Sequence, residues 1–174
     1  TVSIGALADA KVESALSIAA QEGNATLHLA CGAIGALDAL RAARTGHLKN
    51  VTYVGRKPPK GWAGSPAEDA LDLENLSEAT THFTGTAREA SLAYPKNANV
   101  AAAVALSSLG LDNTVVSLIA DPNATSNIHE VRAEGEFGEL AFTISGNSLP
   151  DNPKSSALAA MSVVAGILED RKPI

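Results

Sequence analysis

Segments with strand-like and helix-like hydrophobic periods alternate along this chain, and this alternation limits its possible folds more than any other feature. The expected strands cover residues 2–7, 25–30, 50–54 and 80–86, which are short runs rich in apolar or β-branched residues. The expected helices cover residues 10–21, 34–45, 67–77 and 87–93. Short connections join these segments, which is typical of α/β proteins with helices packed on a sheet.

In the last third of the chain, helix-like segments give way to successive segments with the hydrophobic period of a strand. Residues 114–121, 127–134 and 139–145 are period-two segments joined by short turns, and they predict an antiparallel meander. A polar loop then leads to a final helix over residues 155–169. The sequence thus predicts one mixed α/β unit, whose sheet becomes antiparallel toward its C-terminal end and is flanked by Ala-rich helices.

Local signals mark where several helices begin and end. Asp9 is the expected N-cap of the first helix, and Gly23 is expected to end it in the left-handed conformation. Pro95 stops the helix over residues 87–93. The next helix begins after residues 97–99 and is so rich in alanine that we expect another segment to pack closely against it.

Composition supports this fold class and argues against several classes of function. Hydrophobic residues make up 45% of the 174 residues but aromatic residues only 3%, which favours Ala-faced helices on a sheet. The net charge is -6 with no long run of like charges, so neither nucleic acid nor an anionic membrane is an expected partner. Cys31 is the single cysteine, and no apolar run approaches the roughly 20 residues that span a bilayer. We therefore expect a reducing, cytoplasmic setting.

The four histidines differ in what their positions indicate. The period of two in residues 127–134 places His129 on the same face as Asn127 and Val131, toward the core or a cleft. A shielded histidine there suits a general acid/base, but spacing alone favours a packed histidine bonded to a backbone carbonyl. His28 is expected in the core, and His47 follows a helix C-terminus where a cation is favourable. The remaining histidine, His82, carries no local signal.

Two small-residue or amide-rich segments are further candidates. In Asn97-Ala98-Asn99, one asparagine is expected to cap the following helix, which leaves the other amide for a carboxamide or hydroxylated ligand. The turn Gly32-Ala33-Ile34-Gly35 joins an expected strand to a helix, where a backbone can approach a ligand closely. It does not have the spacing of the dinucleotide-binding glycine fingerprint.

Cations in irregular segments are the third candidate group. Arg56, Lys57 and Lys60 lie in one loop, and Lys154 precedes Ser155 at the start of the final helix. Charge combined with hydroxyl and amide donors would bind a carboxylate, although the residues alone favour a solvated loop lysine with a serine cap for the second segment. The sequence supports neither a metal site nor a serine or cysteine nucleophile.

Seven segments spread over nearly the whole chain together resemble one family, the L-aspartate dehydrogenases. They are residues 5–9, 32–39, 56–59, 85–90, 94–102, 121–122 with 127–129, and 152–156. Each segment is weak evidence by itself, but the set follows the order of the family. Small departures are Cys31, Ala36 and Ser155, which stand where serine, glycine and threonine are common in the family.

The resemblance implies an NAD(P)-dependent oxidoreductase that acts on the CH-NH2 group of L-aspartate. Its product, iminoaspartate, yields oxaloacetate and ammonia or feeds the synthesis of pyridine nucleotides. The family pattern places cofactor contacts on Ala33 and Asn99 and the acid/base on His129, which reverses the interpretation from spacing alone. For the substrate carboxylates, our candidates are Lys154 and the loop of Arg56 and Lys57. Asn127 and Ser155 are further candidate substrate residues.

The resemblance also implies a division of the chain. Residues 1–30 would be a remnant of an N-terminal dinucleotide-binding domain, and residues 31–174 a catalytic domain that also forms a homodimer. The chain opens inside an expected strand, which is typical of a fragment, and the last helix is a candidate for packing back on the cofactor domain. Two alternatives stay open: a related NAD(P)-dependent dehydrogenase of another amino or keto acid, and a non-catalytic dimerisation or ligand-sensing module.

Overall fold

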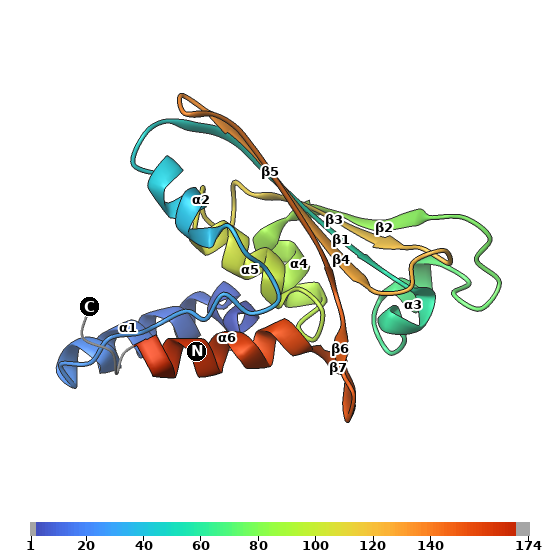
Figure 1. Ribbon diagram of the computed structural model, residues 1–174, viewed down its shortest axis with the longest axis horizontal. Helices are drawn as coiled ribbons and strands as arrows, with labels where there is room; N and C mark the ends of the chain where they lie inside the picture. The colour runs from blue at the N-terminus through green and yellow to red at the C-terminus, as the bar shows by residue number, and fades with distance from the viewer. Residues whose placement is uncertain (1–2, 170–174) are drawn as a thin grey trace.

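The computed structural model describes residues 3–169, apart from the side chains of residues 152–155 and 169. A five-stranded mixed sheet forms its centre, in the order β2-β3-β1-β4-β5 (Figure 1). The strands are β1 (Leu48–Lys57), β2 (Thr80–Thr86), β3 (Val115–Ala120), β4 (Asn127–Gly135) and β5 (Gly138–Gly146). A short hairpin, β6 (Ser148–Leu149) with β7 (Asn152–Ser156), stands apart from this sheet. The predicted fold class, a mixed α/β unit, is confirmed.

The order of the strands differs from a meander. β1 pairs with β3 in parallel and with β4 in antiparallel orientation, so it separates the two strands that the sequence predicts to be neighbours. Only β4 and β5 form the expected hairpin, because a turn of two residues joins them directly. The predicted meander over all three segments is therefore wrong.

Helices cover one face of the sheet (Figure 1). They are α2 (Leu37–Ala43), α4 (Ala87–Ala93) and α5 (Asn99–Leu106). Residues Val100 to Ala105 of α5 are all buried, and the 3-10 helix η1 (Ile4–Ala8) packs against them. The close packing that the alanines predict is thus confirmed, and it places the N-terminal segment in the same core as the sheet.

The first two predicted strands are wrong. Residues Ile4–Ala8 form η1, where Ile4, Leu7 and Ala8 are buried with a spacing of three and four, which a short apolar run does not distinguish from a strand. Residues 25–30 have no strand structure and are largely exposed, since no neighbouring strand pairs with them. His28 therefore lies in an exposed segment and not in the core as expected.

Other helices differ mainly in their bounds. Helix α1 (Ala10–Glu22) has Asp9 as its N-cap as predicted, but Gly23 has a φ of -81° and the left-handed residue is Asn24. Helix α2 begins three residues late because Ala36, with a φ of +61°, interrupts the helical backbone before Leu37. The predicted helix over residues 67–77 shortens to α3 (Ala67–Ala70), while the final helix is α6 (Ala157–Glu169). The 3-10 helix η2 (Pro59–Trp62) follows β1.

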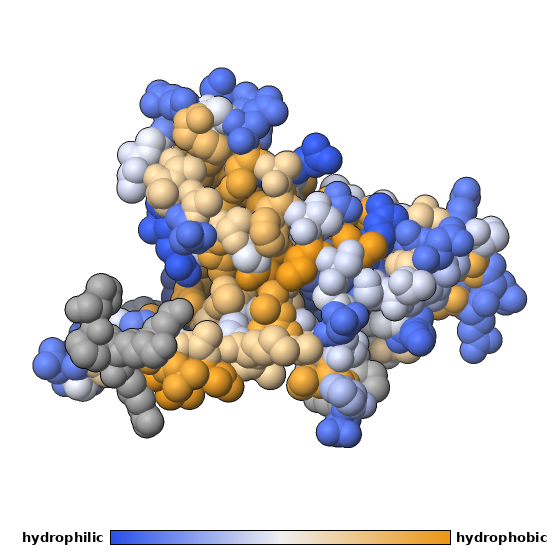
Figure 2. All heavy atoms as spheres, viewed as in Figure 1, coloured by the Kyte–Doolittle hydropathy of each residue, from blue (hydrophilic) through white to orange (hydrophobic). Residues whose placement is uncertain are grey.

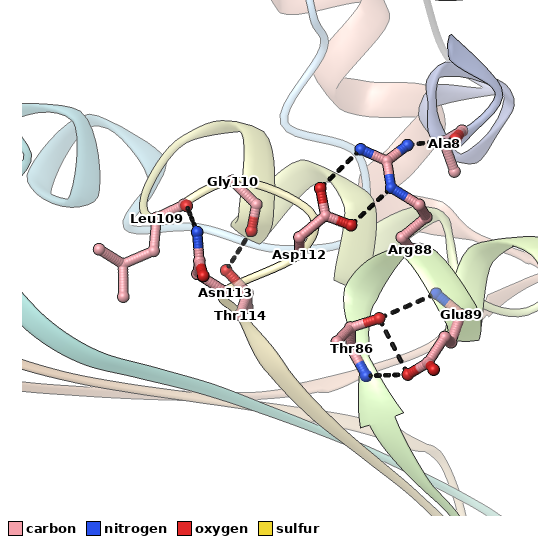
Figure 3. A network of polar contacts seen from close by, with 9 residues as sticks. All are labelled: Ala8, Thr86, Arg88, Glu89, Leu109, Gly110, Asp112, Asn113 and Thr114. Atoms are coloured by element: carbon pink, nitrogen blue, oxygen red, sulfur yellow. Dashed lines mark hydrogen bonds and ion pairs between the residues drawn. The ribbon is translucent and has the colours of Figure 1, made fainter.

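Arg88, on α4, forms hydrogen bonds to η1 and to the loop before β3 (Figure 3). Its guanidinium donates to both carboxylate oxygens of Asp112, at 2.6 and 2.9 Å, and to the carbonyl of Ala8 at 2.5 Å. Helix α4 itself begins with a capping box between Thr86 and Glu89. These contacts hold the segments that surround α5 in place. Within the described residues, no helix is long and apolar enough to cross a membrane.

Candidate active site

A cleft of about 290 Å³ opens beside the N-terminal end of α5 and the ends of β1 and β4. Five residues predicted from the sequence line it: Ala33, Lys57, Asn99, Asn127 and His129. They come from four segments of the chain, since Asn127 and His129 both lie in β4, and the tertiary fold brings them together. A second hollow of about 220 Å³, beside the β4–β5 hairpin, contains none of the predicted site residues.

His129 lies on the helix-covered face of β4, as its period-two position predicts. Its side chain is 4% exposed, and its Nδ1 is 2.8 Å from the hydroxyl oxygen of Tyr53 on β1. The partner of this histidine is therefore a phenol and not the backbone carbonyl that a merely packed histidine was expected to have. Since Nδ1 is occupied, Nε2 is the ring nitrogen available to the cleft.

Burial, and then the charge of Lys57, lower the pKa of His129 to about 4. The imidazole is consequently neutral near pH 7 and can accept a proton. Tyr53 is fully buried, which raises the pKa of its hydroxyl far above the usual range and keeps it protonated. The pair is therefore uncharged until a proton arrives from the cleft.

Lys57 is the cation of the first loop that the structure places at the cleft. Its ammonium lies 4.8 Å from the centre of the Trp62 ring, and among the described residues no carboxylate pairs with it. Burial lowers the pKa of Lys57 to about 8, so it is mostly protonated at neutral pH. An unpaired ammonium in a partly enclosed cleft favours an anionic ligand.

The neighbouring cations are placed elsewhere. Arg56 points to the other side of β1 and donates to Asp121 at 2.9 Å. Lys60 is exposed in η2 and does not line the cleft. Alternation along β1 explains the difference, because Arg56 and Lys57 are adjacent and face opposite sides of the sheet. The predicted irregular loop is in fact strand as far as Lys57.

Asn97 and Asn99, the two asparagines of the segment over residues 97–99, both form hydrogen bonds to distant backbone groups. Neither caps α5, whose N-cap is Ala98 without a side-chain hydrogen bond, so the expected capping role is wrong. Asn97 donates to the carbonyl of Gly61 at 3.0 Å, and Asn99 accepts from the backbone N–H of Gly5 at 2.9 Å. Within the described residues, the Nδ2 amide of Asn99 has no hydrogen-bond partner, which leaves it available to a ligand in the cleft.

The turn around Ala33 forms another wall of the cleft. Gly32 has a φ of +67°, and a side chain at this position would point into open space. Its backbone N–H donates to the hydroxyl of Ser162 on α6 at 3.1 Å. The turn thus leaves open space at Gly32, next to Ala33, and the close approach of a ligand to this backbone stays a prediction.

Ser156 is the second serine of the segment over residues 152–156, whose serines the sequence offers as carboxylate ligands together with Lys154. Its hydroxyl oxygen is buried, lines the cleft and has no hydrogen-bond partner among the described residues. The predicted neighbours Lys154 and Ser155 lie in β7, but their side chains are outside the described part of the chain.

The other histidines lie away from the cleft. His82 on β2 packs against Trp62, with ring centres 4.4 Å apart, and its Nδ1 lies 3.2 Å from the hydroxyl of Tyr94. Burial, and then the charge of Lys57, lower the pKa of His82 to about 4. His47 is exposed after α2, as expected for a residue at a helix C-terminus.

Comparisons with known proteins point to one family. The family profile described as "Aspartate dehydrogenase, C-terminal" matches residues 38–169. An L-aspartate dehydrogenase of Ruegeria pomeroyi is 61% identical over 96% of this chain and 61% of its own length. The L-aspartate dehydrogenase of Pseudomonas aeruginosa is 51% identical over 95% of this chain and 62% of its own length. The chain therefore spans about three fifths of these curated relatives.

A solved structure has the same architecture. The crystal structure of aspartate dehydrogenase from Thermotoga maritima matches with a TM-score of 0.79 at 29% sequence identity. The match covers 99% of this chain and 65% of the other. The arrangement of sheet and helices is thus shared with a protein of that description.

Proposed function

This chain belongs to the aspartate dehydrogenase C-terminal family, and from that premise we propose that it is the catalytic domain of an NAD(P)-dependent L-aspartate dehydrogenase. The reaction oxidises the C–N bond of L-aspartate to an imine, and water then converts iminoaspartate to oxaloacetate and ammonia. One observation carries the proposal: a neutral, shielded His129 shares one cleft with Lys57, which has no carboxylate partner among the described residues. His129 can accept a proton next to the place where Lys57 binds an anion.

His129 is the proposed proton carrier. Because its pKa is lowered to about 4, the ring is neutral before substrate binds. Its Nε2 takes a proton from the substrate ammonium and releases it to solvent, and then takes a second proton from the water that attacks the imine. An anionic substrate beside Lys57 offsets the charge that disfavours the imidazolium. Binding of aspartate therefore raises the proton affinity of His129 at the moment when a base is needed.

Lys57 is the proposed ligand of a substrate carboxylate. Its ammonium is held over Trp62, so the charge is positioned before the substrate arrives. Asn127 and the unpaired hydroxyl of Ser156 line the same cleft and can donate to the second carboxylate. Lys154 and Ser155, the other candidates from the sequence, stay predictions.

The cleft also fits the nicotinamide portion of NAD or NADP. The unpaired Nδ2 of Asn99 can donate to a carboxamide oxygen, and the open space at Gly32 leaves room beside Ala33. When bound, the nicotinamide supplies the hydride acceptor. The chain contributes the placement of both ligands and the exclusion of water around His129.

We further propose that this domain is completed by a cofactor domain and a second copy of the chain. Helix α1 has no buried side chain, and Val12, Leu16 and Ile18 on it are exposed. Apolar residues also gather on α6, where Met161 is 62% exposed (Figure 2). Apolar surface of this extent supports association with further protein. Residues 1–30 stay the proposed boundary segment of the cofactor domain.

The test is aspartate-dependent reduction of NAD and NADP by the full-length protein, followed by absorbance of the reduced nucleotide. We expect turnover with L-aspartate, and a loss of about 100-fold or more in the His129→Gln variant with little change in cofactor affinity. Turnover with another amino acid but not with aspartate would identify a related dehydrogenase. Absence of turnover with every amino or keto acid, despite normal folding, would favour the non-catalytic module.

A further inference from the structure

We infer that Tyr53 is a positioning residue for His129, whose phenol holds the imidazole so that Nε2 faces the cleft. The inference rests on the proposed function, in which His129 carries a proton. Its evidence is the 2.8 Å contact between the Tyr53 hydroxyl and Nδ1 of His129, in the interior between β1 and β4. The rings lie nearly parallel, at 19° with centres 6.0 Å apart.

The register of the two strands makes this contact possible. Gly55 is the residue of β1 directly opposite His129, whereas Tyr53 is opposite Val131. Tyr53 and Gly55 face the same side of β1, so the phenol extends along the strand into the space above Gly55. A Cβ atom at Gly55 would lie 2.9 Å from the Tyr53 hydroxyl. The glycine therefore leaves the space in which the hydroxyl meets the imidazole.

A phenol can accept from Nδ1–H or donate to Nδ1, and our inference assigns Nδ1–H as the donor in this contact. When Nδ1–H donates to the phenol oxygen, the neutral ring carries its lone pair on Nε2, toward the cleft. After Nε2 accepts a proton, the same Nδ1–H bond remains and stabilises the imidazolium. The ring thus keeps one orientation in both protonation states, so proton transfer requires no reorientation.

A phenol differs from the carboxylate that often orients a histidine. A carboxylate would add negative charge and raise the pKa of the imidazole, whereas the buried and protonated Tyr53 adds none. Among the described residues, the charged groups that line the same cleft as His129 are Lys57, on the same strand as Tyr53, and Lys96. Tyr53 therefore fixes the ring and leaves its proton affinity to be set by burial, by these cations and by the bound substrate.

The experiment replaces Tyr53 with phenylalanine in the full-length protein. For the Tyr53→Phe variant we expect kcat with L-aspartate to fall about tenfold or more, with KM for aspartate and cofactor changed less than about threefold. Nitrogen-15 NMR of the His129 ring should show mainly the Nδ1–H tautomer in the wild type and a mixture in the variant. A packing role alone would lower stability and leave the tautomer unchanged.

The matched control is Tyr94→Phe, which removes the other hydroxyl that contacts a histidine, 3.2 Å from Nδ1 of His82 and outside the cleft. We expect it to leave kcat unchanged. Gly55→Ala should resemble Tyr53→Phe, because the added methyl group displaces the hydroxyl.

The outcomes separate this inference from the proposed function. Normal kcat and an unchanged tautomer in Tyr53→Phe, with an inactive His129→Gln variant, would overturn the role of Tyr53 alone. Full turnover in His129→Gln would overturn the proposed function and the role of Tyr53 with it.

Discussion

The ammonium of Lys57 lies 4.8 Å from the centre of the Trp62 ring. Trp62 is completely buried and donates from Nε1 to the carbonyl of Ile119 at 3.0 Å, so the ring is fixed to β3. Gly61 packs against the aliphatic stem of the lysine, since a Cβ atom there would lie 3.2 Å from it. The turn after β1 thus holds one cation at the cleft and explains why Lys57, and not its neighbours, is the candidate anion ligand.

Substitution of Lys57 is expected to affect substrate binding first. In Lys57→Met, the KM for L-aspartate should rise about tenfold or more, because a charge-assisted contact to a carboxylate contributes about 1.5–3 kcal/mol. Lys60→Met is the control, since it removes the same charge from an exposed position a few residues away. Steady-state kinetics checks the prediction, and an equal rise in both variants would contradict it.

Removal of the same charge should also be visible at His129. Burial is the larger cause of its lowered pKa and the charge of Lys57 the smaller, so Lys57→Met should raise the pKa from about 4 without restoring the ordinary 6.5. Titration of the His129 ring proton by NMR, without substrate, measures this directly. A pKa that stays the same would show that the two groups are not coupled.

Acid should destabilise the fold partly through His129. Its pKa is about 4 in the fold and 6.5 in the unfolded chain, so the unfolded state binds a proton first as the pH falls. The loss of stability therefore begins near pH 6.5 and is complete below about pH 4, with a limit of about 3 kcal/mol. Urea unfolding of His129→Gln should show a weaker pH dependence between pH 7.5 and 4.5. An unchanged pH dependence would contradict the assignment.

Substitution of Asn99 can separate its hydrogen bond to Gly5 from its proposed contact with the cofactor. Asn99→Asp keeps an oxygen that accepts from the Gly5 N–H and loses the Nδ2 donor proposed for the cofactor carboxamide. We expect KM for NAD or NADP to rise several-fold with a smaller change in kcat, while Asn99→Ala also loses the link to Gly5 and lowers the melting temperature. A cofactor KM unaltered in Asn99→Asp would exclude the proposed contact.

Two glycines provide a matched test of packing. A Cβ atom at Gly35 would lie 2.7 Å from Phe142, so Gly35→Ala should lower the free energy of unfolding by about 1–3 kcal/mol. Gly166 lies inside α6 with no atom near its added Cβ, and Gly166→Ala should raise that energy by up to about 1 kcal/mol. Denaturant unfolding compares the two, and the reverse order would contradict the packing of β5 on the segment before α2.

The sequence by itself determines those features that depend on near neighbours. β2 and α4 have the predicted bounds, because β-branched residues favour a strand and Thr86 with Glu89 forms a capping box at the turn between them. The buried face of β4 is also correct, since a period of two requires no knowledge of the partner strand. The family resemblance is confirmed by the matching profile over residues 38–169.

Only the tertiary structure decides what depends on contacts between distant segments. Alternation tells which face a residue occupies but not which strand lies beside it, so the insertion of β1 between β3 and β4 could not be predicted. The same limit hides the contact of Tyr53 with His129, which are 76 residues apart, and the choice of Lys57 over Arg56. The chemistry of the cleft depends on these long-range contacts, because burial and neighbouring charge, and not local sequence, set the pKa of each group.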